Sequence, residues 1–430
     1  MIRFVDLFAG IGGIRKGLEQ ALAKHGIENI CVFSSEIDEH SQKTYSLNFD
    51  EVSNGDIRLV DALPDHDILL AGFPCQAFSY AGKKKGFADT RGTLFFEIER
   101  LISSSKNKPK LMLLENVRGF TTHDKGRTYT TIISKLGSLG YKVKPILINS
   151  SNFDVPQNRV RIYLVCALGK EPVIDIESSP GSADSHAYKT ASRQPDLFYA
   201  QNKCRVVKDI LEEKVDKKYN CSEMFCDQLT SALNGKSYNE LHGVRLIDYR
   251  GGNSLHSWDL GLKGRCTEDE RSLMNAIISN RRKKHFGIEQ DGKELTLGQI
   301  STFWYKSNLE VLLSSLIKKG YLRKINEKYN PTCGNMSFEV FKFLDPKSIS
   351  ITVVSSDANR LGIVQNGMPR RITPREIARL QGFSNDFILH PKDPWAYRQL
   401  GNSVSVPVIT AIFENLVKHS NHPFKGNTKL

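Results

Sequence analysis

Short apolar segments alternate with helical segments over the first 168 residues, and this alternation limits the folds open to the chain more than any other feature. The apolar segments include Ile-Leu-Leu-Ala-Gly-Phe at 68–73 and Leu-Met-Leu-Leu at 111–114. Near-continuous apolar strands separated by helices are typical of a parallel sheet with helices on both faces. We therefore expect an α/β fold. The expected strands span 2–8, 30–37, 67–73, 111–117, 143–148 and 160–167, with helices to about residue 24 and over 94–103 and 128–139.

Polar residues gather where these strands end. Ligands of such a sheet bind beyond the carboxyl ends of its strands. The candidates at that edge are Asp6, Gly10, Glu36, Asp56, Cys75 and Glu115.

A glycine-rich turn follows the first strand and precedes a helix, which suits a nucleotide-like ligand because glycine allows close backbone approach. The G-x-G-x-x-G pattern is incomplete, since Gly10 and Gly12 fit but position 15 is Arg. Glu36 could bind ribose hydroxyls, and Asp56 could accept from an exocyclic amine. Together they indicate a cofactor that contains adenosine; the alternative is a pair of solvated loop acids.

Cys75 lies in a Gly-Phe-Pro-Cys-Gln turn after a strand, where nearby backbone N–H groups favour the thiolate of a nucleophile. Glu115 ends a strand at the same edge, and partial desolvation there would keep its carboxyl protonated. Arg159 and Arg161 share one strand face and suit a carbonyl, carboxylate or phosphate. Each has a structural alternative: an inert turn cysteine, an exposed acid and a salt-bridged strand edge.

The segment after Cys75 combines glycines with a lysine run. Ser79, Lys83, Lys84 and Arg91 lie in it. We expect a mobile lid that seeks phosphates. A solvated basic loop is the alternative.

A second domain is expected from the change in character after about residue 170, where basic pairs multiply. Arg281, Arg282 and Lys283 belong to one such run. Capping boxes start helices at Thr267, Thr296 and Ser307, and a hairpin of 321–324 with 338–343 would follow. These elements favour a winged helix-turn-helix over 267–345, with an ordinary helical insertion as the alternative. The domains are then 1–168 with 366–430, and 169–365.

Composition and the N-terminal sequence indicate which binding partners and which cellular compartment to expect. Lys and Arg number 60 against 47 Asp and Glu, so the net charge is +13, which favours nucleic acid before an anionic membrane. We expect no membrane span, and a cytoplasmic location because the chain enters a strand directly after Met1. The eight cysteines form no C-x-x-C pair. We expect them reduced and no metal, although Cys221 and Cys226 leave a metal site as the alternative.

Six segments, in the family's order, resemble the motifs of the DNA cytosine-5 methyltransferases. The resemblance covers Phe4–Leu168 and Ile372–Leu416, about half the chain. The segments are Asp-Leu-Phe-Ala-Gly-Ile-Gly-Gly at 6–13, Gly-Phe-Pro-Cys-Gln-Ala-Phe-Ser at 72–79, Glu-Asn-Val at 115–117, Gln-Asn-Arg-Val-Arg at 157–161, Thr-Pro-Arg-Glu-Ile-Ala-Arg-Leu-Gln-Gly-Phe at 373–383 and Gly-Asn-Ser-Val at 401–404.

The resemblance implies a Rossmann-like methyltransferase domain that binds S-adenosylmethionine, with a mostly parallel sheet and an antiparallel seventh strand, plus a smaller target-recognition domain. It implies that Cys75 attacks C6 of a flipped cytosine, Glu115 holds N3 and the amine, Arg161 supports the O2 side and Arg159 orders the site. The implied cofactor residues are Asp6, Phe8, Gly10, Gly12, Gly13, Glu36, Ile37, Asp56, Ile57, Pro74, Asn402 and Ser403.

The implied partner is double-stranded DNA with a short specific sequence. The expected DNA contacts are Ser79, Lys83, Lys84, Arg91, Arg281, Arg282 and Lys283. We expect no regulatory extension of the chromatin type, which favours a bacterial restriction-modification enzyme or an orphan enzyme. We also expect a monomer, and a cognate endonuclease encoded nearby. A DNA-binding regulator and an RNA cytosine methyltransferase are the competing hypotheses.

Overall fold

The computed structural model describes residues 1–74, 94–176, 178, 205–249, 251–286, 293–332, 338–419 and 423–424. The chain divides into two compact units, each built from separate stretches. Unit 1 comprises Met1–Leu211, Ile349–Ala358 and Pro374–Leu430, and unit 2 comprises Glu212–Ser348 and Asn359–Thr373. The functional division at 169 and 366 stays a prediction, because compactness alone does not say which residues recognise a target.

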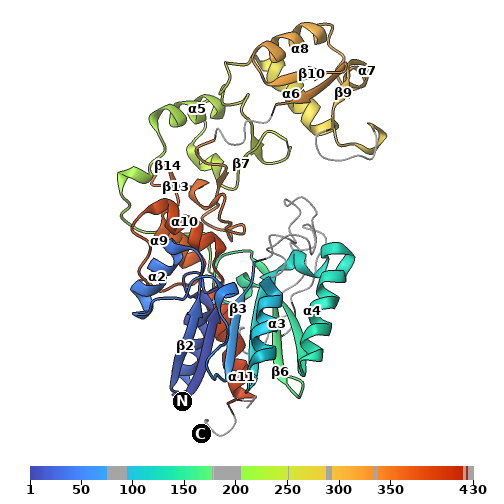
Figure 1. Ribbon diagram of the computed structural model, residues 1–430. Coiled ribbons are helices and arrows are strands. Elements are labelled where there is room, and N and C mark those ends of the chain that lie inside the picture. Colours follow the sequence, from blue (N-terminus) through green and yellow to red (C-terminus); the bar gives the residue numbers. More distant parts are fainter. Residues whose placement is uncertain are drawn as a thin grey trace. The chain divides into compact units, whose positions relative to one another are not determined.

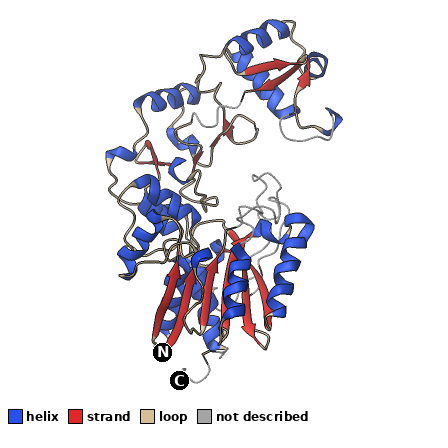
Figure 2. Ribbon diagram, viewed as in Figure 1, coloured by secondary structure: helices blue, strands red, loops and turns tan. Residues whose placement is uncertain are grey.

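A six-stranded sheet forms the centre of unit 1 (Figures 1 and 2). Its strands are β1 (Ile2–Leu7), β2 (Asn29–Ser35), β3 (Ile68–Gly72), β4 (Leu111–Val117), β5 (Tyr141–Asn149) and β6 (Val160–Leu168), in the order β2-β1-β3-β4-β6-β5. β2, β1, β3 and β4 pair in parallel, whereas β6 is antiparallel to β4 and to β5. The mostly parallel sheet is confirmed, but the antiparallel strand is the sixth among the described residues and not a seventh.

Helices cover both faces of this sheet, because side chains alternate along each strand and both sets are apolar. α1 (Gly13–Lys24) and α11 (Val406–Lys418) share one core with the strands, and α3 (Leu94–Ser104) and α4 (Arg127–Ser138) share the other. The helices predicted to about residue 24 and over 94–103 and 128–139 are confirmed as α1, α3 and α4. α2 (Glu39–Phe49), α9 (Pro374–Leu380) and α10 (Asp393–Asn402) complete the unit.

One stretch of the described chain, Asp393–Lys418, is by length and composition alone apolar and long enough to cross a membrane. The most apolar part of this stretch is 78% buried inside the fold, as expected of core helices. It contains α10 and α11, which both contribute to the interior of unit 1.

A five-stranded sheet and α5 (Glu223–Leu233) share one core of unit 2. The strands are β7 (Arg245–Leu246), β8 (Ser254–Leu255), β12 (Lys342–Phe343), β13 (Leu361–Gln365) and β14 (Met368–Arg371), in the order β14-β13-β12-β7-β8.

A separate core in unit 2 holds three helices and a three-stranded sheet. The elements are α6 (Glu268–Asn280), β9 (Leu295–Thr296), α7 (Leu297–Ser301), α8 (Leu309–Lys318), β10 (Leu322–Ile325) and β11 (Lys328–Pro331). The capping boxes predicted at Thr267 and Thr296 are confirmed. The third is wrong, because Asn308 and not Ser307 precedes the helix and its side chain makes no capping hydrogen bond.

The predicted hairpin is also wrong in its second strand. β10 pairs with β11, and residues 342–343 instead form β12 of the five-stranded sheet. Asn326 and Glu327 have φ of +49° and +62°, a conformation that closes a two-residue hairpin turn directly after β10. Phe338 and Phe343 are buried in the core that contains α5, which draws their segment away from β10.

Candidate active site

The glycine turn after β1 is joined to the end of β2 by the side chain of Glu36. Gly10 N–H donates to Glu36 Oε2 at 2.8 Å, and Asp38 N–H donates to Oε1 at 2.8 Å. Burial raises the pKa of Glu36, and these hydrogen bonds oppose the shift. Phe8, Gly10 and Gly12 have φ of +55°, +56° and +81°, so the turn follows a tight path. The structure thus brings together two predicted cofactor segments.

Ser403 lies against the start of α1. A Cβ on Gly13 would lie 2.8 Å from Ser403 Oγ and 3.0 Å from Val404 Cγ2, so only glycine fits there without movement. The predicted cofactor residue Ser403 is therefore adjacent to the glycine turn, although 390 residues separate the two along the chain. Asn402, at the end of α10, is exposed.

Asp6 is buried at the end of β1, and neither carboxyl oxygen has a hydrogen-bond partner among the described residues. Burial raises the pKa of Asp6 to about 8, and the nearby Arg15 opposes the shift. A neutral carboxyl costs less to bury than a carboxylate. The side chain of Asp6 is therefore enclosed within the fold, near Arg15.

The loop that carries Asp56 is held beside β2, because Glu36 N–H donates to the carbonyl of Asn54 at 2.7 Å. Asp56 itself pairs with Arg58, which lowers the pKa of its carboxyl. Ile57 is buried in the core, whereas Ile37 is 64% exposed. Of these predicted cofactor residues, Ile37 thus presents an apolar side chain at the surface, while Ile57 faces the interior.

The register of β3 and β4 places Gly72 opposite Glu115. A Cβ on Gly72 would lie 3.8 Å from Glu115 Oε2. Pro74 ends this described stretch of the chain. The predicted nucleophile Cys75 and the predicted DNA contacts Ser79, Lys83, Lys84 and Arg91 lie outside the described residues.

Glu115 forms an ion pair with Arg161 from the antiparallel neighbour β6, with Nε and Oε1 3.2 Å apart. Both side chains are largely buried, with exposed fractions of 13% for Arg161 and 12% for Glu115. Burial raises the pKa of Glu115, and the charges of Arg161 and Arg159 oppose this. The site therefore combines a carboxyl that keeps its proton more readily than usual with a fixed cation.

Arg159 connects two stretches of the chain that are distant in sequence. Its guanidinium is buried and donates to the carbonyl of Val353 at 2.9 Å and to the carbonyl of Ser403. Burial lowers its pKa to about 9, which leaves it cationic at neutral pH. Arg159 orders the chain around Ser403, and it makes no hydrogen bond to Glu115 among the described residues.

Residues 2–418 match the sequence pattern of a protein family described as C-5 cytosine-specific DNA methylase. The chain belongs to this family. It is 58% identical to the Type II methyltransferase M.BanI of Aneurinibacillus aneurinilyticus, over 100% of this chain and 99% of the relative. It is also 58% identical to the Type II methyltransferase M.HgiCI of Herpetosiphon aurantiacus, over 98% of this chain and 99% of the relative. The resemblance seen in the six segments is confirmed.

The fold is similar to that of the Entamoeba histolytica methyltransferase EhMeth. The TM-score is 0.54 at 19% identity, and the match covers 97% of this chain and 98% of that one. The likeness supports a Rossmann-like methyltransferase fold for the methylase.

Family membership implies a methyl donor of the S-adenosylmethionine type, and the residues at the glycine turn fit such a group. Nothing lies within 4 Å of a Cβ built on Gly10, so a ligand can approach this backbone. Glu36 keeps unused acceptor lone pairs on both oxygens. The exposed Ile37 adds an apolar contact next to it.

Asn116 is a site residue that the sequence-based reasoning left unassigned. Its Nδ2 donates to the carbonyl of Phe73 at 3.2 Å, and its Oδ1 accepts from Val117 N–H at 2.8 Å. This buried amide thereby fixes the backbone that leads to Pro74 and the predicted nucleophile. Its position directly after Glu115 was the available signal.

A buried pair of glutamines joins three parts of the methylase. Gln157 donates to the carbonyl of Leu380 at 2.8 Å and accepts from Val353 N–H at 2.9 Å. Gln381 donates to the carbonyl of Leu400 at 3.0 Å. Both glutamines lie in segments that resemble family motifs. Their partners are backbone groups, most of them far away along the chain, so the sequence alone could not identify these hydrogen bonds.

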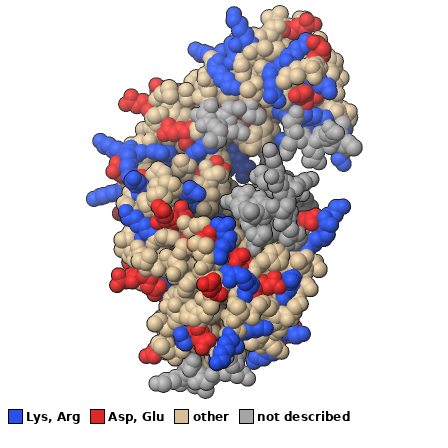
Figure 3. All heavy atoms as spheres, in the orientation of Figure 1, with Lys and Arg blue, Asp and Glu red and all other residues tan. Residues whose placement is uncertain are grey.

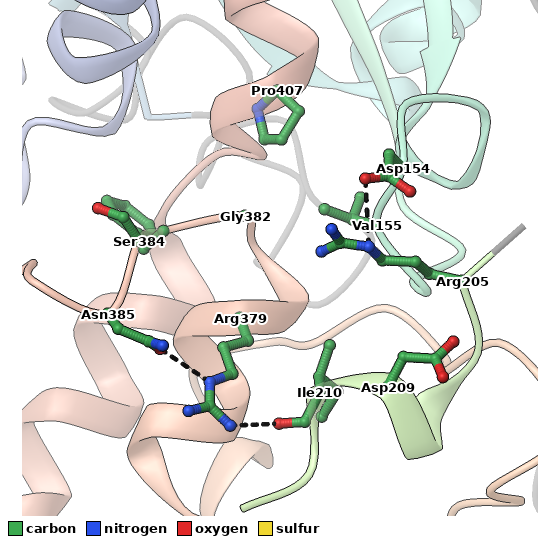
Figure 4. Close-up of a pocket in the computed structure, with 11 residues that line it drawn as sticks. Asp154, Val155, Arg205, Asp209, Ile210, Arg379, Gly382, Ser384, Asn385 and Pro407 are labelled. Atoms are coloured by element: carbon green, nitrogen blue, oxygen red, sulfur yellow. Dashed lines mark hydrogen bonds and ion pairs between the residues drawn. The ribbon is translucent and has the colours of Figure 1, made fainter. Parts of the chain in front are cut away.

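A cleft of about 390 Å³ lies beside α9 in unit 1 (Figure 4). Arg205 and Asp154 pair across 3.2 Å, and Arg379 donates to Asn385 at 2.9 Å and to the carbonyl of Ile210 at 3.0 Å. The lining contains none of the predicted catalytic or cofactor residues. This cleft is therefore distinct from the candidate active site.

Of the predicted DNA contacts in unit 2, Arg282 and Lys283 are exposed just beyond α6. The prediction for Arg281 is corrected, because its side chain is buried within the fold and so is not presented to a ligand. Among the described residues, no group of three or more His, Cys, Asp or Glu is placed to hold a metal. Burial raises the pKa values of the Cys221 and Cys226 thiols.

Proposed function

We propose that this methylase transfers a methyl group from S-adenosylmethionine to C5 of a cytosine flipped out of a specific short DNA duplex sequence. The reaction would run through a covalent adduct between Cys75 and C6. The observation that supports this most directly is the pairing of β3 with β4, which sets the strand leading to Cys75 beside the buried Glu115–Arg161 pair.

The thiolate of Cys75 would add to C6, and the electron pair of the C5–C6 double bond would move onto C5, which thereby becomes nucleophilic. A protonated Glu115 would donate to N3 and accept from the exocyclic amine, which stabilises the electron-rich ring. Arg161 would hold Glu115 in place and face the O2 side. Arg159 would act indirectly, by ordering the chain at Ser403.

S-adenosylmethionine, when bound, would supply an electrophilic methyl group. Glu36 would bind its ribose hydroxyls. The cofactor would lie against the backbone of the turn at Gly10 and Gly12, and Ser403 would close the site from the other side. Formation of the C5–methyl bond would be followed by loss of the C5 proton to a base, which water could provide. The C6–S bond would then break and restore the Cys75 thiol.

The target cytosine would have to leave the duplex, because stacking hides C5 and C6 from any side chain. Flipping costs a few kcal/mol of unstacking energy. Lys83 and Lys84 would lie in a segment that closes behind the extruded base.

We assign target recognition to residues 169–365, which contain most of unit 2, and propose that residues 267–345 include a winged helix. We place the enzyme in the bacterial cytoplasm as a monomer of a restriction-modification system, where it protects host DNA from a cognate endonuclease. The names of its 58% identical relatives, Type II methyltransferases, support this assignment.

The test uses duplex DNA with 5-fluorocytosine at the methylated position, because fluorine at C5 cannot leave as a proton does. We expect a covalent protein–DNA complex that requires both S-adenosylmethionine and Cys75, and loss of that complex in Cys75→Ser. A matched control, Cys166→Ser, changes a buried thiol of β6 outside the proposed chemistry. Near-normal methylation by Cys75→Ser would disprove the covalent mechanism.

A further inference from the structure

The elements with their own core in unit 2 follow one another as helix, strand, two helices and a two-stranded hairpin. α6 comes first, β9 and α7 follow, and α8 leads into β10 and β11. The three strands form an antiparallel sheet in the order β10-β11-β9. This succession is that of a winged helix, in which the last helix before the hairpin is the one that presents its outer face to a DNA groove.

One face of α8 is buried and the other is open. Leu309, Leu312, Leu313 and Leu316 are buried in the core with α6. The exposed positions are Ser307 just before the helix, then Glu310, Val311, Ser314 and Lys318. Apart from the adjacent Glu310 and Val311, successive positions are three or four residues apart, which places them along one stripe.

The open stripe has an unusual chemistry for a surface helix. Val311 is 72% exposed, and Tyr305 in the turn before α8 is 87% exposed. Glu310 makes no hydrogen bond or ion pair with another described residue. An apolar side chain and an unpaired carboxylate on one stripe match a partner that offers both an apolar contact and a hydrogen-bond donor.

The flanking hairpin supplies the charge that a nucleic acid requires. Arg323, Lys324 and Lys328 are exposed on β10 and β11. Lys324 pairs with Glu327 at 2.7 Å, while Arg323 lies 3.9 Å from Glu294 and Lys328 makes no ion pair with a described residue. Figure 3 shows lysine and arginine side chains on the part of the surface that holds these elements, with acidic ones among them.

We propose that the exposed stripe of α8 reads base edges in the major groove of duplex DNA, and that the β10–β11 hairpin holds the phosphate backbone. This rests on the proposed function, which it deepens by naming residues that determine the target sequence. Glu310 would accept from the N4 amine of a cytosine, Val311 would contact a thymine methyl group, and Ser307 and Ser314 would bond to either kind of edge.

A carboxylate in the groove makes this assignment specific. Phosphates repel Glu310, so it lowers the affinity for duplex DNA in general and is favourable only where a cytosine amine meets it. Lys328 has the opposite character, because it attracts any duplex regardless of its sequence.

The test compares full-length wild-type protein with Glu310→Gln, Val311→Ala and Lys328→Ala. Duplexes are selected from a random pool by equilibrium binding and sequenced. In parallel, the pool is incubated with S-adenosylmethionine and its 5-methylcytosines are mapped by bisulfite sequencing. Ser272→Ala, at an exposed position of α6 outside the stripe, is the matched control. Thermal melts establish that each variant folds.

We expect Glu310→Gln and Val311→Ala each to relax or change the base selected at one or two positions by about tenfold or more. Lys328→Ala should weaken binding to all sequences alike and reduce the salt dependence by about one released counterion. Ser272→Ala should select the wild-type sequence.

The inference is overturned if folded Glu310→Gln and Val311→Ala both select the wild-type sequence, or if wild-type protein selects no sequence at all. A wild-type protein that selects a sequence but forms no 5-methylcytosine refutes the proposed methyl transfer instead. The binding selection then still decides whether α8 reads bases.

Discussion

At the scale of single residues, the environment of Glu115 determines what its carboxyl can do. Burial raises its pKa, so the acid form persists to higher pH than for an exposed glutamate. In the proposed mechanism, the protonated carboxyl below the raised pKa donates to N3 of the cytosine, and the carboxylate above it cannot. Methyl transfer should therefore decline on the alkaline side as Glu115 loses its proton.

We predict that Glu115→Gln lowers kcat by about 10²- to 10⁴-fold, since an amide can donate a hydrogen bond but cannot supply a proton. Duplex binding should change little. The measurement is kcat against pH for both proteins, and the alkaline decline assigned to Glu115 should be absent from the residual activity. Glu99→Gln on α3, where the carboxylate pairs with Lys135, serves as control. An unchanged alkaline limb in Glu115→Gln would assign that limb to another group.

Residues of the candidate site could be predicted from the sequence where the side chain and its position in a strand are sufficient evidence. Glu36 beside the glycine turn and Glu115 beside the strand before Cys75 follow from the rule that strand ends share an edge. Arg281 could not be predicted in this way, because a basic run does not show which of its members faces inward. The partners of Arg159 were also hidden, since they are carbonyls of Val353 and Ser403, and every residue carries a carbonyl.

At the scale of elements, glycine in two helices has two different roles. Gly17 is buried in α1 where α11 crosses it, and a Cβ there would lie 2.7 Å from Ile409 Cγ2 and 3.0 Å from the carbonyl oxygen of Val406. Gly137 is exposed near the end of α4, and a Cβ at that position would have no neighbouring atom within 4 Å.

We predict that Gly17→Ala lowers the free energy of unfolding by about 1–3 kcal/mol, because the added methyl group overpacks the contact between α1 and α11. Gly137→Ala should instead raise it by up to about 1 kcal/mol, because alanine favours the helix and meets no neighbour. Urea denaturation of both variants measures the difference. Equal effects of the two substitutions would show that the packing of α11 on α1 does not determine the cost.

Elements were predictable where the sequence repeats a strong pattern. The six strands of unit 1 are apolar enough to be recognised individually, and the capping boxes at Thr267 and Thr296 mark their helices. α2 and α10 were missed, since α2 has few apolar residues at helical spacing and begins only with the cap of Asp38. The β10–β11 turn was missed because it contains no glycine, although its residues Asn326 and Glu327 both adopt left-handed backbone angles.

At the scale of the whole molecule, the chain folds by returning to unit 1 twice. Residues 349–358 and the stretch from 374 onward belong to unit 1. Gln157 and Arg159, which lie just before β6, bond to Val353 and so attach the segment 349–358 to the rest of the unit. A change of composition along the sequence signals that a second unit exists. It cannot reveal a return as short as 349–358, because so short a stretch has no composition of its own.

The net charge of +13 belongs to the molecule as a whole and should dominate its binding to duplex DNA of arbitrary sequence. Each phosphate neutralised by Lys or Arg releases a counterion, so affinity falls as salt rises. We predict at least a tenfold loss of affinity for a nonspecific duplex between about 50 and 200 mM salt, measured by fluorescence anisotropy. S-adenosylmethionine affinity, measured by calorimetry at the same salt concentrations, should change much less because the proposed cofactor site consists of glycine backbone, Glu36 and Ser403. A flat salt response of duplex binding would show that the excess positive charge lies away from the DNA.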